Sequence, residues 1–219
     1  MPRSNFENEL KQLQVELIQM GSLVERAIEQ SIEAFKTHDL LRCEQIVEND
    51  KEIDELERQI ESACLWLIAR QQPVASDLRG ITTALKIATD MERIGDHASD
   101  IAELTMRIDD KNAFADSSHI PQMAAAAVKM VHSAVNAFVN ADLDLAERTE
   151  KQDDEVDAYF NMIKEELVNV FNTQPQNMDN AVDYMLIAKY LERIADHAVN
   201  ICEWVHFSQT GAHKNTQIF

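Results

Sequence analysis

Residues 91–103 read MERIGDHASDIAE, and residues 191–203 read LERIADHAVNICE. Eight of the thirteen aligned positions are identical, at an offset of 100 residues. Residues 20–40 align with residues 123–143 at an offset of 103, so a three-residue deletion separates the two registers. Chance similarity between two amphipathic helices would not reproduce E-R-I-x-D-H-A in full. The sequence therefore predicts a duplicated unit of about a hundred residues, which is too long for the repeat of a solenoid.

Helix breakers are rare, since the 219 residues include only four Gly and four Pro. Apolar residues recur at helical spacing between the few breaks. The expected helices are 4–37, 40–71, 75–108, 119–140, 143–172 and 178–208. Asp39 and Asp142 stand where each can cap the second helix of its half. Because short connections make consecutive helices antiparallel, we predict an all-α fold of two tandem, pseudo-symmetric three-helix bundles, residues 1–112 and 117–219.

The charge balance excludes several classes of protein. There are 39 Asp and Glu against 20 Lys and Arg, a formal net charge of −19, which argues against a nucleic-acid partner and a polybasic membrane anchor. We expect no signal peptide and no transmembrane segment, because the longest apolar run, residues 123–128, is far too short to span a bilayer. Cys43, Cys64 and Cys202 form no CxxC pair, which favours reduced core thiols in a cytoplasmic protein.

Carboxylates are placed symmetrically about the first interhelical turn. Asp54 lies 19 residues before Pro73 and Glu92 lies 19 after it, while Asp50 and Asp96 lie 23 before and 23 after. In an antiparallel pair of helices with equal rise per residue, Asp54 is then level with Glu92, and Asp50 is level with Asp96. We call these four residues the first cluster.

The second half repeats the arrangement about a midpoint between Gln174 and Pro175. Its four carboxylates, called the second cluster, are Asp153, Asp157, Glu192 and Asp196. Four anions a few ångströms apart cannot all stay ionised without a compensating cation. Two alternatives remain. A solvated acidic face would not explain the repeated mirror spacing, and Arg93 and Arg193, which could neutralise the charge, point about 100° around the helix from the preceding Glu.

We therefore predict metal sites on oxygen ligands. Carboxylate oxygens suit divalent or trivalent ions such as Fe, Mn, Mg or Ca, and Zn is a further candidate. The paired motifs favour more than one ion per site. His97 and His197 lie about 100° around the helix from the preceding aspartate, which favours packed or supporting histidines. No phosphate-binding loop, nucleophile elbow or zinc-protease motif occurs, so we expect no enzyme. A carboxylate-bridged metalloenzyme is the alternative.

Tandem [DE]-x-x-x-D motifs followed by E-R-I-x-D-H-A on three-helix repeats resemble the PhoU family of bacterial phosphate-signalling proteins. Residues 70–79, RQQPVASDLR, also resemble the first hairpin of that family. The resemblance covers nearly the whole chain, and the two copies of E-R-I-[GA]-D-H-A are its specific part.

The resemblance implies a cytoplasmic, homodimeric adaptor that negatively regulates phosphate uptake and the phosphate-starvation response. Its partners would be the ATPase of the phosphate ABC transporter and a membrane sensor histidine kinase. It also implies multinuclear metal clusters, with both acidic clusters as ligands and Asp100 and Asn200 as a second tier. The family usually has Asn at the positions of Asp100 and Asn200, so Asp100 is a departure from the family pattern. Its extra charge would make the two metal sites unequal. An accessory protein of a Pit-type phosphate transporter is a further alternative.

Overall fold

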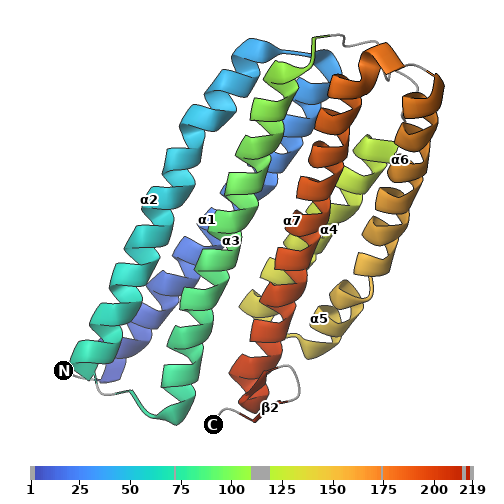
Figure 1. Ribbon diagram of the computed structural model, residues 1–219. Helices are drawn as coiled ribbons and strands as arrows, with labels where there is room; N and C mark the ends of the chain where they lie inside the picture. The colour runs from blue at the N-terminus through green and yellow to red at the C-terminus, as the bar shows by residue number, and fades with distance from the viewer. Residues whose placement is uncertain (1–2, 72, 110–118, 174, 214–215, 218–219) are drawn as a thin grey trace.

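The structure is a computed structural model that describes residues 3–71, 73–109, 119–173, 175–213 and 216–217. The first half contains α1 (Arg3–Thr37), α2 (Leu40–Gln71) and α3 (Ala75–Arg107), which run antiparallel in succession (Figure 1). The second half contains α4 (His119–Asn140), α5 (Leu143–Glu150), α6 (Asp153–Thr173), a 3₁₀ turn (Pro175–Asn177) and α7 (Met178–Thr210). A short hairpin of β1 (Ala212–His213) and β2 (Thr216–Gln217) follows. The prediction of an all-α fold of two pseudo-symmetric bundles is confirmed.

One predicted helix is wrong, because residues 143–172 form two helices rather than one. The helix is interrupted at Lys151 and Gln152, where the Gln152 amide donates a hydrogen bond to the Thr149 carbonyl at 2.9 Å. Residues 153–155 are all acidic, and carboxylates are most favourable in the first turn of a helix, where free amides and the helix dipole stabilise them. This favours a new helix start at Asp153. The terminal hairpin was not predicted, and the predicted domain boundary, residues 113–116, lies outside the described residues.

The turns between the first two helices of each half repeat in detail. Asp39 Oδ1 accepts a hydrogen bond from the Arg42 amide at 3.1 Å, and Asp142 Oδ1 accepts one from the Leu145 amide at 2.9 Å. Both predicted caps are confirmed. The residues before them, His38 and Ala141, both have left-handed backbones, with φ of 54° and 51°. The duplication therefore extends to the conformation of the turn.

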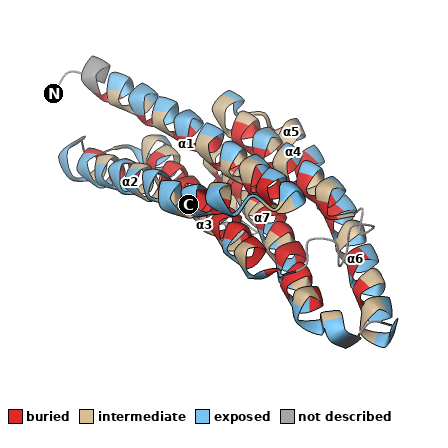
Figure 2. Cartoon of the chain, turned by 90° about the horizontal axis from the view of Figure 1, so that it is seen from above, coloured by how far each residue is buried: buried red, intermediate tan, exposed pale blue. Residues whose placement is uncertain are grey.

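The two halves share one hydrophobic core. The helices α3 and α7 lie side by side at the centre and run in opposite directions (Figure 1). The two copies of the motif bury their apolar residues there, with Met91, Ile94, Leu191 and Ile194 all fully buried. Buried residues line the inner faces of the helices, while the exposed faces point outward (Figure 2).

All three cysteines are free and buried, as predicted for core thiols. Burial raises the pKa of Cys64 and Cys202 to about 12, so both remain protonated at neutral pH. The sulfur atoms therefore act as apolar packing atoms.

The glycine of the first motif lets α2 approach α3 closely. A Cβ atom at Gly95 would lie 2.8 Å from Ile53 Cδ1 and 3.1 Å from Asp50 Oδ1. The corresponding residues of the second half are Ala195 and Val156, so a larger residue on one helix is matched by a smaller one on the other. Gly95 thus sets the distance between the helices that carry the first cluster.

We expect Gly95→Ala to destabilise the chain by about 1 kcal/mol, because overpacking costs about 1–3 kcal/mol and the gain in helix propensity returns about 1 kcal/mol. Adding Ile53→Val should recover most of the loss, since it reproduces the pairing of the second half. Urea unfolding followed by circular dichroism measures both variants. A double variant no more stable than Gly95→Ala alone would show that Ile53 is not the obstacle.

Candidate metal centre

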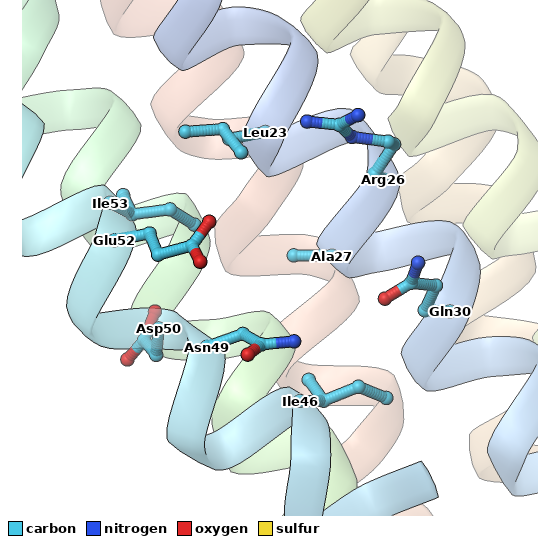
Figure 3. Close-up of a pocket in the computed structure, with 9 residues that line it drawn as sticks. All are labelled: Leu23, Arg26, Ala27, Gln30, Ile46, Asn49, Asp50, Glu52 and Ile53. Atoms are coloured by element: carbon cyan, nitrogen blue, oxygen red, sulfur yellow. The ribbon is translucent and has the colours of Figure 1, made fainter.

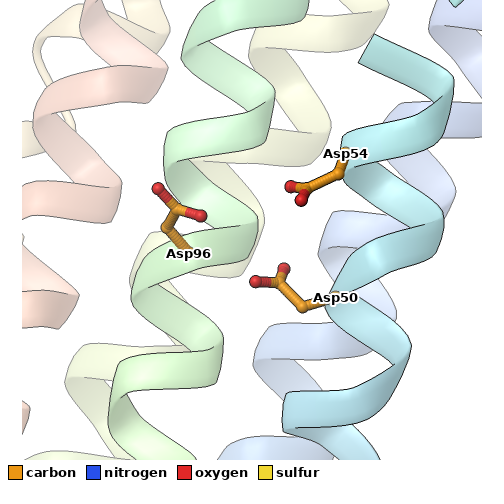
Figure 4. A group of neighbouring side chains, drawn as sticks. All are labelled: Asp50, Asp54 and Asp96. Carbon is orange, nitrogen blue, oxygen red and sulfur yellow. The ribbon is translucent and has the colours of Figure 1, made fainter. Parts of the chain in front are cut away.

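The first cluster lies in the seam between α2 and α3. Asp50 and Asp54 point from α2 toward Asp96 on α3 (Figure 4). Each of these three residues offers a carboxylate oxygen within 4.8 Å of the other two. Glu92 lies one turn before Asp96; burial raises its pKa, and the charges of Asp96 and Asp54 add to the rise. The four residues thus meet in the seam, and three of them form the tightest group.

Asp50 has the most perturbed carboxyl group of the cluster. Burial raises its pKa to about 7, and the charges of Asp96, Asp54, Glu92 and Asp100 add to the rise. Its Oδ1 atom is buried and has no hydrogen-bond partner among the described residues. A buried carboxylate oxygen without a donor is costly unless a cation meets it. The donor set of all carboxylate oxygens fits a hard ion such as Mn²⁺, Mg²⁺ or Ca²⁺.

Arg93 supplies part of the missing positive charge. Its Nη1 atom lies 3.2 Å from Asp96 Oδ2, and its Nε atom lies 3.4 Å from Glu92 Oε2. The arginine side chain is 55% exposed, so these ion pairs are weakened by water. Neither contact reaches Asp50 or Asp54. Arginine neutralisation is therefore partial, and two carboxylates of the cluster are left to repel each other.

Two cavities meet Asp50 from different sides. A cleft of about 530 Å³ lies between the two halves and is lined by residues that include Asp50, Asp96, His97, Asp100 and Arg193. A smaller cavity of about 270 Å³ lies between α1 and α2, where Arg26 and Gln30 face Asn49, Asp50 and Glu52 (Figure 3). An ion could therefore reach the seam from water.

The second cluster is assembled less tightly. Burial raises the pKa of Asp153 to about 6, and the charges of Asp157, Asp196 and Glu192 add to the rise, so the four residues do share one seam between α6 and α7. Asp157 and Asp196 are exposed, whereas their counterparts in the first cluster are half-buried. Within the described residues, only the first half brings three candidate ligand atoms within 4.8 Å of one another.

The second-tier residues have different surroundings. Asp100 lines the cleft beside Asp50, and its charge contributes to the raised pKa of Asp50. Asn200 instead donates a hydrogen bond to Asp90 Oδ1 on α3, at 3.3 Å. The two positions are equivalent in sequence, but only Asp100 adds to an acidic cluster.

Both histidines of the repeated motif pack between the halves. His197 Nδ1 lies 2.8 Å from Asp90 Oδ1, and His97 Nδ1 lies 3.3 Å from Asp100 Oδ2. The two imidazole rings are 5.7 Å apart between centroids. This agrees with packed or supporting histidines. Asp90 was not identified from the sequence as a functional residue. The one signal was a difference between the two halves, because the equivalent residue of the second half is Tyr190.

The family model described as the PhoU domain matches residues 17–105 and 120–205, one match in each half. The chain belongs to the PhoU family. The matched ranges contain all eight residues of the two clusters.

Curated PhoU relatives align along almost the whole chain. A "phosphate-specific transport system accessory protein PhoU homolog" from Clostridium acetobutylicum is 37% identical, and the match covers 96% of this chain and 97% of the relative. Homolog 1 from Thermotoga maritima is also 37% identical, with 98% of this chain and 92% of the relative covered.

Solved PhoU structures have the same fold. The crystal structure of PhoU from Pseudomonas aeruginosa superposes with a TM-score of 0.85 at 32% identity, covering 94% of this chain and all of the other. The phosphate transport system regulatory protein PhoU from Streptococcus pneumoniae superposes with a TM-score of 0.89 at 28% identity, covering 95% and 98%. Among the described residues, no helix has the length and apolar character needed to cross a membrane.

Proposed function

We propose that this chain is a non-enzymatic, cytoplasmic adaptor that represses phosphate uptake and the phosphate-starvation response when phosphate is plentiful. It would couple the ATPase of a phosphate ABC transporter to a membrane sensor histidine kinase, as a homodimer. The observation that carries the proposal is the match to PhoU relatives over nearly the full length of both chains, because those relatives are named as accessory proteins of phosphate-specific transport.

Metal binding is the second part of the proposal. The first cluster, with Asp100 beside it, would hold one or more divalent or trivalent ions, and the second cluster would hold others. The support is the buried, unpartnered Oδ1 of Asp50 and the close approach of Asp54 and Asp96. Bound metal would supply positive charge between α2 and α3. The carboxylates would then hold the two helices together rather than push them apart.

A carboxylate-bridged metalloenzyme is the second candidate. The cleft of about 530 Å³ beside the first cluster favours it, because a substrate would need such a space. The adaptor is preferred because the curated relatives, matched over nearly their full length, are named as accessory proteins of phosphate-specific transport. An accessory protein of a Pit-type transporter would share the same fold, and neighbouring genes would separate it from the adaptor.

The test is a deletion strain of the host. Loss of the gene should raise alkaline phosphatase expression in high phosphate, and the wild-type gene should restore repression. The triple variant Asp50→Asn/Asp54→Asn/Asp96→Asn should fail to restore it at equal protein level, whereas Glu48→Gln, an exposed residue of α2, should succeed. A deletion strain whose alkaline phosphatase expression equals that of the wild type in both high and low phosphate would refute the adaptor.

A further inference from the structure

Three differences between equivalent positions make the first cluster more negative, and one, Lys51 against Asp154, acts in the opposite direction. Residue 57 is Glu in the first half, and residue 160 is Phe in the second. Residue 89 is Thr, and residue 189 is Lys. Residue 100 is Asp, and residue 200 is Asn. The first seam thus carries six carboxylates, and the second carries five, Asp154 included, with a lysine beside them.

Lys189 is held against the second cluster. Its ammonium group forms an ion pair with Glu192, whose side chain is only 18% exposed. The same ammonium lies 5.7 Å from the ring centroid of Phe160, within range of a cation–π interaction. Phe160 therefore occupies the site of the missing carboxylate and helps to hold the lysine in place. Burial and Glu192 raise the pKa of Asp196, and the Lys189 charge opposes that rise.

The first half has no such lysine at the equivalent position. The Thr89 hydroxyl donates a hydrogen bond to the Leu85 carbonyl at 3.2 Å and carries no charge. Glu57 adds a carboxyl group whose pKa is raised by burial and by the charges of Glu61 and Asp54. The half-exposed Arg93 is the counter-ion of this seam, and it contacts Glu92 and Asp96 but neither aspartate of α2.

The helix break adds to the difference. Asp153 is the first residue of α6, where the helix dipole favours a carboxylate, and its buried Oδ1, like that of Asp50, has no hydrogen-bond partner among the described residues. Asp50 lies in the interior of α2, where this compensation by the dipole does not exist. The chain therefore neutralises the second cluster more fully than the first, where Arg93 reaches neither aspartate of α2.

We propose that Lys189, held by Phe160, is a built-in counter-ion that competes with metal at the second cluster, so that the first cluster is the high-affinity centre. The inference rests on the proposed metal sites. Metal entering the second cluster must displace the ammonium group from Glu192. At the first cluster, metal meets Asp50 and Asp54, which the contacts of Arg93 with Glu92 and Asp96 do not reach. The two centres would therefore fill in order, the first at low metal concentration and the second at high.

Titration with Mn²⁺ tests this proposal. Electron paramagnetic resonance measures the free Mn²⁺, and the bound ions are the difference between the total and the free concentration. The wild-type chain should show one tight and one weak class of site. Lys189→Thr, which places the first-half residue in the second half, should tighten the weak class by about threefold. Thr89→Lys should weaken the tight class by a similar factor. Lys164→Thr is the matched control, since Lys164 is exposed on α6 about two turns beyond Asp157.

The classes are assigned with variants that remove one cluster at a time. Asp50→Asn/Asp54→Asn should abolish the tight class, and Asp153→Asn/Asp157→Asn should abolish the weak one. Circular dichroism confirms that each variant is folded. Unchanged Mn²⁺ affinities in Lys189→Thr, or a tight class that maps to the second cluster, would overturn the role of Lys189 while leaving the metal sites intact. Absence of any Mn²⁺ binding by the wild-type chain would overturn the metal sites as well.

Discussion

A hundredfold excess of Mn²⁺ over its dissociation constant should raise the free energy of unfolding of the wild-type chain by about 3 kcal/mol. The reason is that the folded chain gathers Asp50, Asp54 and Asp96 into one seam, whereas the unfolded chain spreads them apart. The variant Asp54→Ala/Glu92→Ala should lose most of this gain, because it removes one ligand from each helix. Urea unfolding with and without Mn²⁺, followed by circular dichroism, measures the difference.

The matched control is Glu48→Ala/Glu165→Ala, which removes two exposed carboxylates outside the clusters. It should keep the full gain. If both double variants respond to Mn²⁺ as the wild type does, the stabilisation comes from nonspecific binding to an acidic surface and not from the seam.

The metal-free chain should become less stable as the pH rises from about 4 to about 7. In the folded state Asp50 keeps its proton up to about pH 7, whereas in the unfolded state it loses the proton near its ordinary pKa of 3.8. Between these values the folded state binds more protons, so raising the pH favours unfolding. After allowance for partial exposure, ionising this group in the seam costs about 2 kcal/mol. Asp153 contributes in the same direction up to about pH 6.

Asp50→Asn isolates this effect, because the amide has the shape of the carboxylate without its charge. In chelator, the variant should be about 2 kcal/mol more stable than the wild type at pH 7.5 and no more stable at pH 4. Urea unfolding at a series of pH values gives both numbers, with Glu48→Gln as the control on the same helix. A wild-type chain with equal stability at pH 4 and pH 7.5 would show that the cluster is not strained in the absence of metal.

The position of the first cluster could be predicted because it depends on few quantities. Antiparallel helices of equal rise place residues equidistant from Pro73 at the same level, and Asp50 and Asp96 do lie together. The boundaries of the helices other than 143–172 and the caps at Asp39 and Asp142 followed from local patterns. All of these depend on backbone geometry, which is uniform along an α-helix.

The details that distinguish the two clusters could not be predicted in the same way. The break at Lys151 and Gln152 interrupts a stretch whose apolar spacing is helical on both sides. Asp90 meets His197 because α3 and α7 pack together, and no spacing within either helix indicates that contact. Lys189 lies over Phe160 only through the packing of α6 on α7.

The sequence by itself determined that this chain is a duplicated helical protein with two mirrored sets of carboxylates. That information lies in periodicity and residue counts, which survive without knowledge of any side-chain contact. Only the tertiary structure decided which carboxylates lie closest together and which are exposed. It also decided which basic side chain contacts each cluster. Those properties depend on how one helix packs on another, because a residue's charge environment comes mainly from neighbours that are distant in sequence.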